Sequence, residues 1–184
     1  MARVLIPLAS GFEELEAVTM IDLLRRAGVD VVTASLLDDG SVRGARGTVL
    51  VPDATLDLVL NQDFDMIALP GGLPGADHLR DDPRIIDLLQ RFSASGRFTA
   101  AICAAPKALA AAGVLKDRTA TAYPGVLEPL GLASTTLSHA AVEIDGNVIT
   151  SRGPGTAIDF TLELIRQLRG PSVAAQVEAS LSRT

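Results

Sequence analysis

The sequence contains one cysteine, Cys103, and no tryptophan among its 184 residues. A single cysteine cannot form an internal disulfide, and it cannot supply a zinc site that needs several thiolate ligands. The cysteine content therefore predicts a protein of a reducing compartment, and we expect a cytoplasmic location.

Basic surfaces and long apolar runs are also lacking. The formal net charge is −6, and aromatic residues make up only 3% of the chain. Nucleic-acid binding is therefore not expected, because it needs clustered Lys and Arg. The apolar runs are too short to span a membrane, and residues 4–9 are too few for the apolar core of a signal peptide. We expect no membrane association.

Hydrophobic residues are abundant, at 48% of the chain, and most of them are aliphatic because aromatic residues make up only 3%. A core of Val, Leu, Ile and Ala suits a sheet that is buried on both faces by helices. The length fits one domain, and we found no repeat and no low-complexity linker. Residues 1–184 are therefore predicted to form a single domain.

Apolar strand-like runs alternate with helical patterns along the chain. This alternation predicts an α/β protein, a three-layer sandwich with a mainly parallel sheet. The dipeptide Asp145-Gly146 between two apolar runs indicates a hairpin, and a turn is expected at 38–40. Strands are predicted at 3–8, 30–36, 65–69, 99–102, 141–144 and 147–150, a hairpin excursion at 42–51, and helices at 12–27, 83–95, 104–112, 154–169 and 171–179.

In parallel sheets of this kind, ligands bind at the carboxyl ends of the strands. The loops that follow Leu8, Leu69, Ile102 and Thr150 therefore form the expected functional edge.

Cys103 lies at one of these strand ends, just before a predicted helix. A helix N-terminus stabilises a thiolate, which would make Cys103 a nucleophile. The small residues around it suit a strained nucleophile elbow. The alternative is that Cys103 is a small buried hydrophobe, which is how most free cysteines behave.

The first loop is followed by a glutamate on an apolar helix stripe. Glu16 is four residues from both Phe12 and Met20, so it is expected to face the core or a partly exposed mixed face. If Glu16 is buried, its raised pKa would let it donate a proton. Ser10 and Glu13 fit a capping box, and Glu14 is expected to be solvated.

Two glycine-rich loops follow other strands. Residues 70–75 lack the spacing of a dinucleotide-binding loop and of a phosphate-binding P-loop. Gly71 and Gly72 are compatible with an oxyanion hole or with a tight turn. In residues 151–156, Arg152 is compatible with binding an anion or with a structural ion pair.

Only two histidines are present, His78 and His139, and neither directly follows a predicted strand of the functional edge. We expect both at the surface. A Cys–His hydrolytic pair is therefore not evident, and a carboxylate has to serve as the base.

Taken in order, these segments resemble the ThiJ/PfpI superfamily, and within it the bacterial-type members of the DJ-1 branch. The resemblance runs through nearly the whole chain. It is carried by residues 13–16, 25–28, 69–72 with 75–76, 101–104, 150–156 and 173–177.

The resemblance implies a flavodoxin-like sandwich of the class I glutamine amidotransferase type, a homodimer and no cofactor. It implies that Cys103 is the reactive elbow cysteine, that Glu16 is its acid partner, and that the amides of Gly72 and Ala104 form the oxyanion hole. The activity implied is that of a glyoxalase III or deglycase acting on small reactive carbonyls, such as methylglyoxal. The alternative is an oxidative-stress sensor or holdase chaperone that uses the same cysteine.

One position departs from the family pattern. Tyr123 precedes Pro124 where the family often has a histidine, and a phenol is a poor base at neutral pH. Tyr123, Arg152 and Gly71 are therefore candidate auxiliary residues. Ala104, directly after the cysteine, argues against peptidase activity, because peptidase relatives typically have a histidine there.

Overall fold

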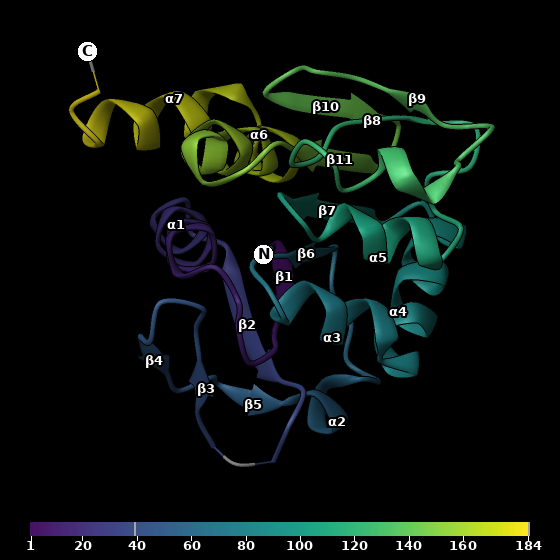
Figure 1. The fold of residues 1–184 in the computed structure, drawn as a ribbon. Helices are drawn as coiled ribbons and strands as arrows, with labels where there is room; N and C mark the ends of the chain where they lie inside the picture. The colour runs from purple at the N-terminus through teal and green to yellow at the C-terminus, as the bar shows by residue number, and fades with distance from the viewer. Residues whose placement is uncertain (39, 184) are drawn as a thin grey trace.

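The computed structural model describes residues 1–38 and 40–183, and its centre is a twisted sheet (Figure 1). Within these residues the main sheet has seven strands in the order β10-β11-β7-β6-β1-β2-β5. The strands are β1 (Arg3–Leu8), β2 (Asp30–Ser35), β5 (Ala54–Thr55), β6 (Met66–Leu69), β7 (Phe98–Ile102), β10 (Val142–Asp145) and β11 (Val148–Ser151).

The sheet is parallel except at one edge. There β10 pairs antiparallel with β11, and Gly146 turns the hairpin with a φ of +61°. The remaining pairs are parallel, so the carboxyl ends of β1, β6, β7 and β11 lie at one edge. This order is flavodoxin-like, and the predicted fold class is confirmed.

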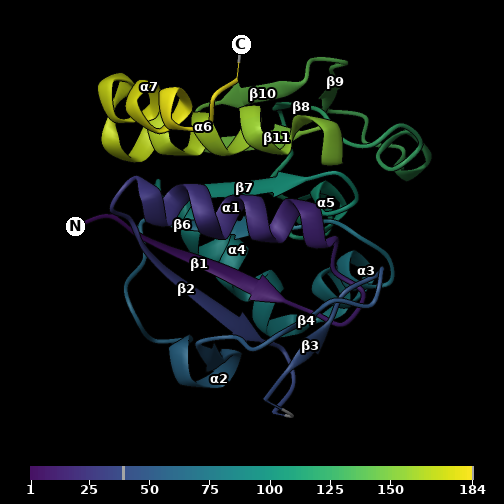
Figure 2. The same ribbon diagram turned by 90° about the vertical axis from the view of Figure 1, so that its left-hand side faces the viewer.

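Helices cover both faces of the sheet, as Figure 2 shows. One layer contains α1 (Glu14–Arg26), α6 (Ala157–Arg169) and α7 (Pro171–Ser180). The other contains α2 (Leu56–Val59), α3 (Gly75–Asp81), α4 (Pro83–Ala94) and α5 (Pro106–Ala111). The predicted three-layer sandwich is therefore present.

The core is divided into two clusters by the sheet. Phe12 and Phe160 are the largest fully buried side chains, and both belong to the cluster under α1 and α6. The strand β6 is buried along its whole length because helices lie on both of its faces. Its continuous apolar run, rather than an alternating one, follows from this burial.

Helix ends follow local chemistry. Arg25 and Arg26 occupy the last turn of α1, and Gly28 follows with a φ of +69°, which favours glycine. At the start of α4, Asp82 accepts a hydrogen bond from the Arg84 backbone N–H at 2.9 Å, and Pro83 opens the helix.

Several short elements were not predicted, and some predicted bounds differ. The hairpin excursion is present as β3 (Val42–Arg43) and β4 (Val49–Leu50). A small pair, β8 (Thr119–Ala120) with β9 (Thr136–Leu137), and the 3-10 turns η1 (Glu128–Leu130) and η2 (Pro154–Thr156) were missed, as were β5, α2 and α3. The turn predicted at 38–40 includes residue 39, which lies outside the described residues.

Within residues 1–38 and 40–183, no helix combines the length and the apolar character that crossing a membrane requires.

Candidate active site

Cys103 lies directly after β7, where the ends of the central strands meet. Its backbone N–H donates to the Ser151 carbonyl at 2.9 Å, and its own carbonyl accepts from the Tyr123 N–H at 2.9 Å. Cys103 has a φ of +63°, a left-handed conformation that side-chain-bearing residues rarely adopt. Strained backbone of this kind is concentrated at functional sites, so the geometry favours the elbow interpretation over simple packing.

The helix after Cys103 begins later than predicted. It starts at Pro106 and contains only six residues, whereas residues 104–112 were predicted. The expected stabilisation of a thiolate by the helix dipole stays a prediction. The backbone N–H groups of Gly72 and Ala104 donate to the sulfur and act to lower the pKa of Cys103.

Gly71 allows three groups of the site to come together. A Cβ at this glycine would stand 2.7 Å from Cys103 Cβ, 2.8 Å from Glu16 Oε2 and 2.9 Å from the Ala104 nitrogen. Any side chain there would separate the thiol from the carboxyl group. Position 71, a predicted auxiliary residue, therefore requires glycine because Cys103, Glu16 and Ala104 lie so close to it, and not because the chain turns there.

Glu16 is fully buried, with 0% of its surface exposed. Its Oε2 accepts a hydrogen bond of 2.7 Å from the Gly71 N–H, whereas its Oε1 has no hydrogen-bond partner among the described residues. Burial raises the pKa of Glu16 to about 7, and the Gly71 and Cys103 hydrogen bonds oppose this rise only in part. Glu16 therefore exchanges a proton near neutral pH.

Burial also acts on the thiol. Three effects raise the pKa of Cys103 to about 12: burial of the thiol, the charge of Glu16, and the hydrogen bond that Glu16 accepts from the thiol. This is the opposite of the lowered pKa expected from the sequence, because burial of the thiol and the charge of Glu16 outweigh the backbone donors. The two groups therefore titrate as a pair, which shares one proton above pH 7.

When the pair holds one proton, its negative charge lies either on the carboxyl group or on the sulfur. The surroundings favour the sulfur. The Glu16 carboxyl is fully buried and has one backbone donor, Gly71. The Cys103 sulfur is partly exposed and has two donors, Gly72 and Ala104. A protonated Glu16 removes the repulsion and offers an O–H donor, so the pKa of Cys103 falls when Glu16 holds its proton.

The loop after β1 packs tightly on the glycine loop after β6. Gly72 has a φ of +88°, and the Glu13 N–H donates to the Gly71 carbonyl at 2.9 Å. A Cβ at Gly72 would overlap the backbone of Gly11 and Phe12. This contact fixes the start of α1 and with it the direction of Glu16.

Two expectations about this loop were wrong. Helix α1 has Glu13 at its N-cap with no side-chain cap hydrogen bond, so Ser10 and Glu13 do not form a capping box. Glu14 is not simply solvated, because its Oε1 accepts from the N–H groups of Arg46 at 2.7 Å and Thr48 at 3.3 Å. Although burial opposes it, these donors lower the pKa of Glu14.

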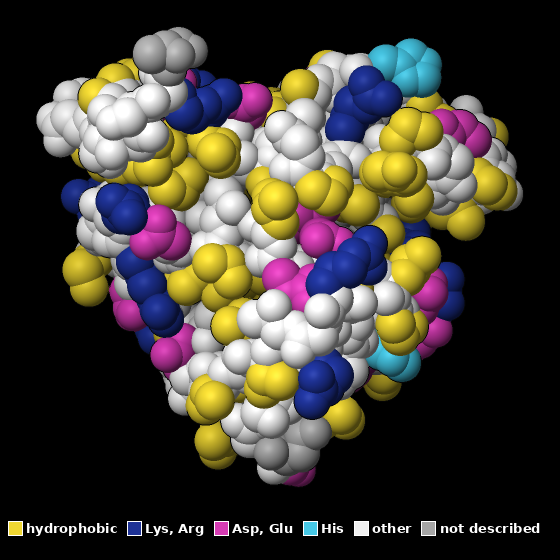
Figure 3. Space-filling view, turned by 60° about the vertical axis from the view of Figure 1, so that its left-hand side comes forward, with side chains coloured by type: hydrophobic (Ala, Val, Ile, Leu, Met, Phe, Trp, Pro, Cys, Tyr) yellow, Lys and Arg dark blue, Asp and Glu magenta, His cyan; other side chains and the backbone are white. Residues whose placement is uncertain are grey.

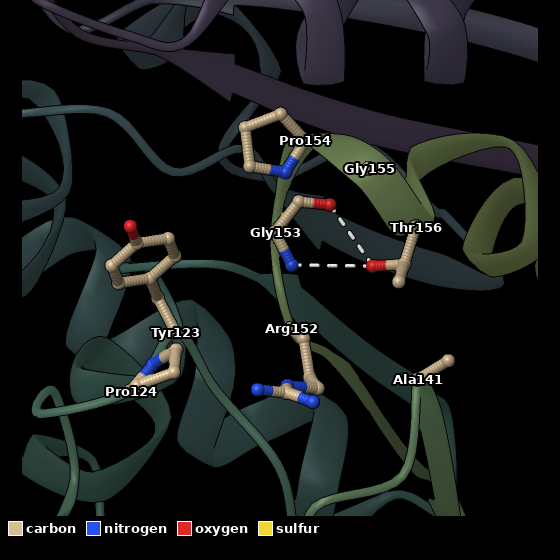
Figure 4. A pocket seen from close by; sticks show the side chains of 8 residues that line it. All are labelled: Tyr123, Pro124, Ala141, Arg152, Gly153, Pro154, Gly155 and Thr156. Carbon is tan, nitrogen blue, oxygen red and sulfur yellow. Dashed lines mark hydrogen bonds between the residues drawn. The ribbon is translucent and has the colours of Figure 1, made fainter.

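A cavity of about 410 Å³ opens between the loop at Tyr123 and the loop after β11 (Figure 4). A Cβ at Gly153 would stand 3.2 Å from the Tyr123 ring and 3.9 Å from Cys103 Sγ, so these residues connect the cavity to the thiol. Eight residues line it: Tyr123, Pro124, Ala141, Arg152, Gly153, Pro154, Gly155 and Thr156.

The structure bears on one of the two interpretations of Arg152, the structural ion pair. Its guanidinium donates to the His139 carbonyl at 3.4 Å and takes part in none of the ion pairs found among residues 1–38 and 40–183. The structural ion pair is therefore wrong. His78 and His139 are both exposed, as predicted, and neither lines the cavity.

The surface in Figure 3 carries basic and acidic side chains interspersed with apolar ones. Ion pairs such as Arg25–Asp53 at 2.9 Å and Arg26–Asp22 at 2.8 Å illustrate this mixing. Among the described residues, no group of three or more His, Cys, Asp or Glu side chains is arranged to hold a metal ion.

Comparison with known proteins gives consistent matches. Residues 2–167 match the DJ-1/PfpI family. A Danio rerio protein named Parkinson disease protein 7 homolog is 41% identical over 97% of this chain and 96% of its own length. Protein DJ-1 homolog A of Arabidopsis thaliana is 43% identical over 97% of this chain, but the chain spans only 46% of that relative.

Two further matches bear on function and fold. A Caenorhabditis elegans protein named Glutathione-independent glyoxalase DJR-1.2 is 38% identical over 86% of this chain and 84% of its own length. A solved structure described as Toxoplasma gondii DJ-1, oxidized, superimposes with a TM-score of 0.93 at 39% identity, covering 98% of each chain.

Proposed function

The chain belongs to the DJ-1/PfpI family, and on this premise we propose that it is a cofactor-independent glyoxalase that converts 2-oxoaldehydes such as methylglyoxal into 2-hydroxy acids. One observation carries this proposal: a partly exposed thiol, a buried carboxyl group with a pKa of about 7 and two backbone donors converge at one sheet edge. The similarity to a relative named as a glyoxalase supports it.

In the first step, the Cys103 thiolate adds to the aldehyde carbon. A carbon–sulfur bond forms, and the electrons of the carbonyl double bond move to oxygen. The N–H groups of Gly72 and Ala104, which already point at the sulfur, are placed to stabilise the oxyanion. Glu16 then gives its proton to that oxygen, which yields a hemithioacetal and leaves Glu16 ionised.

In the second step, the Glu16 carboxylate removes the proton from the former aldehyde carbon. The electron pair forms the double bond of an enediolate. Glu16 returns the proton to the neighbouring carbon, and the hydroxyl proton of the former aldehyde carbon passes to the oxygen of the former ketone, which completes an internal redox change. The aldehyde carbon is oxidised to a thioester while the ketone is reduced to an alcohol. Water then cleaves the thioester, which releases the 2-hydroxy acid and restores Cys103.

The pKa of about 7 suits Glu16 to both transfers. A group that gives and takes a proton at neutral pH works best when its pKa lies near the working pH. Because His78 and His139 lie outside the cavity, no histidine is assigned a role in these steps. The reaction also balances without any external oxidant or cofactor.

The test is lactate formation from methylglyoxal without added thiol. We expect the wild-type protein to form lactate, Cys103→Ala to lose the activity, and Glu16→Gln to lose at least about 100-fold in kcat, which is the usual contribution of acid–base catalysis. Lys116→Ala, on the exposed loop after α5, is the control. Equal rates for the wild-type protein and Cys103→Ala would overturn the proposal.

The deglycase variant of this activity uses the same residues on an early methylglyoxal adduct of an amine or thiol. Stopped-flow measurements with a preformed adduct distinguish the two. A rate that exceeds spontaneous release of free methylglyoxal supports direct action on the adduct. A rate limited by that release assigns the activity to the free aldehyde.

A second candidate function is oxidation sensing. The thiol of Cys103 is partly exposed, and a protonated Glu16, whose Oε1 has no hydrogen-bond partner among the described residues, would donate a hydrogen bond to a sulfinate formed there. The oxidized state named for the Toxoplasma gondii structure supports this candidate. After treatment with mild peroxide, mass spectrometry should detect two added oxygens on Cys103 before any oxidation of the three Met residues. Oxidation of the Met residues first would contradict sensing.

The homodimer and the single domain remain predictions. Leu15, Val18, Val49 and Val51 expose apolar side chains on α1 and near β4, which would give a second copy an apolar contact surface. Analytical ultracentrifugation of the wild-type protein and of Val51→Asp is the test. A dimer that the substitution weakens supports the prediction.

A further inference from the structure

The cavity beside Cys103 contains one charged residue among those that line it, Arg152. Figure 4 shows its guanidinium turned toward Pro124, at the base of Tyr123. The main-chain contact to His139 is long, at 3.4 Å, and uses only one of the five N–H donors of the group. None of the ion pairs found among the described residues includes this guanidinium.

Tyr123 adds a second donor to the same cavity. Its side chain is 53% exposed, and its ring packs against Gly153 next to the sulfur. A phenol donates a hydrogen bond at neutral pH, and a guanidinium has no acceptor at all. The cavity is therefore rich in donors and has no acid of its own, a combination that suits the recognition of an anion.

We propose that Arg152, assisted by Tyr123, binds a carboxylate on the substrate, and that the preferred substrates are 2-oxoaldehydes with a carboxylate-bearing side chain. This inference rests on the proposed function and deepens it. The planar guanidinium matches the two oxygens of a carboxylate, and such bidentate pairs are among the stronger hydrogen-bonded contacts.

The charge of the whole protein makes a local cation necessary. The formal net charge of −6 repels anions over the surface as a whole. A carboxylate-bearing substrate therefore needs a specific positive group at the site, and Arg152 is the only residue of the cavity lining that offers one. A neutral substrate such as methylglyoxal gains nothing from this arginine by charge.

A suitable probe is 4,5-dioxopentanoate, in which the 2-oxoaldehyde and a carboxylate are separated by two methylene groups. Addition of one water and the internal redox change described above give 2-hydroxyglutarate and one proton, so the reaction balances. The methyl ester has the same reacting atoms without the charge. The cavity of about 410 Å³ has room for either molecule.

The kinetic test compares these two substrates. In the wild-type protein, we expect kcat/KM to be about ten- to hundredfold higher for the carboxylate than for its ester, the range of a charge-assisted hydrogen bond. In Arg152→Met, this ratio should fall to about one, and in Arg152→Lys it should be intermediate. A ratio that is unchanged in Arg152→Met would overturn the inference.

Arg169→Met is the matched control. The Arg169 guanidinium also donates to a single main-chain carbonyl, that of Gly28 at 2.7 Å. It lies at the opposite edge of the sheet, where β2 begins. The ratio of kcat/KM for the carboxylate to kcat/KM for its ester should therefore keep its wild-type value in Arg169→Met. This control separates an effect of the cavity from a general effect of lost positive charge.

A binding measurement separates this inference from the proposed function. Tyr123 is the only tyrosine, and there is no tryptophan, so intrinsic fluorescence reports on this cavity. Levulinate, which lacks the aldehyde, should change that fluorescence in the wild-type protein and in Cys103→Ala, and methyl levulinate should do so only at much higher concentration. If levulinate binds but 4,5-dioxopentanoate and methylglyoxal are not converted, the proposed function alone is overturned. If levulinate and methyl levulinate bind equally well, the carboxylate site is overturned.

Discussion

Glu16 and Cys103 meet across Gly71, so closely that a methyl group on this glycine would lie 2.8 Å from the carboxyl oxygen and 2.7 Å from the cysteine Cβ. Each group alters the protonation of the other. The ionised carboxyl raises the pKa of the thiol, and the thiol hydrogen bond lowers the pKa of the carboxyl. The chemistry of the site is therefore that of a pair with one shared proton.

The first prediction concerns the reactivity of the thiol. Because the pair gives up its first proton near pH 7 and a protonated Glu16 donates to the sulfur, we expect the reaction of Cys103 with iodoacetamide to have its midpoint near pH 7, below the ordinary thiol pKa of about 8.5. Glu16→Gln provides a weaker donor and should react about tenfold more slowly at this pH, the effect of one pKa unit. Cys103 is the only cysteine, so total alkylation is its readout. A wild-type midpoint above pH 9 would show that Glu16 ionises first.

The second prediction concerns stability. The pKa of Glu16 is raised from 4.5 to about 7 in the folded state, so the folded protein holds this proton more tightly than the unfolded chain. Its contribution is fully present below pH 4.5 and is lost as the pH rises through 7. The loss corresponds to about 3 kcal/mol.

Glu16→Gln removes this titration. We expect the variant to gain about 3 kcal/mol in unfolding free energy relative to the wild-type protein between pH 4 and pH 8, and to be the more stable protein at pH 8. Urea denaturation at both pH values measures the difference. A difference that does not change with pH would mean that Glu16 is not buried as a titrating acid.

The third prediction concerns the close approach at Gly71. Gly71→Ala should destabilise the fold by about 1–3 kcal/mol through overpacking, and it should push the carboxyl group away from the thiol. Gly155 has nothing within 4 Å of an added Cβ, so Gly155→Ala should change the unfolding free energy by no more than about 0.5 kcal/mol. Equal stabilities of the two variants would contradict the close-approach argument.

The fourth prediction concerns Tyr123, where a histidine is expected from the family pattern. Tyr123→His places a base with a pKa near 6.5 beside the sulfur, and we expect it to raise kcat/KM for methylglyoxal by about tenfold above pH 7. The pH profile should gain an ionisation near that value. Tyr123→Phe adds no titrating group and should show no new ionisation. A profile for Tyr123→His that matches Tyr123→Phe would exclude proton transfer from this position.

Local pattern determined much of the fold. The strands β1, β7 and β11, the hairpin at Gly146 and the end of α1 at Gly28 were predicted because apolar periodicity and turn chemistry act over a few residues. The position of Cys103 after a strand followed from the same local patterns, whereas the pattern left open whether Glu16 is buried, and the structure decided that it is. Short elements such as β8 and β9 were missed because two-residue strands leave no periodicity to read.

The tertiary structure alone decided how the site is protonated and charged. The hydrogen bond from Gly71 to Glu16 joins residues 55 positions apart, and the loop contacts that hold Glu14 join residues 32 and 34 positions apart. Whether Arg152 has a carboxylate partner likewise depends on segments that are distant in the sequence. A pKa depends on burial and on neighbours within a few ångströms, so the sequence and its family resemblance named Cys103 and Glu16, but only the folded structure showed that burial raises the pKa of both groups.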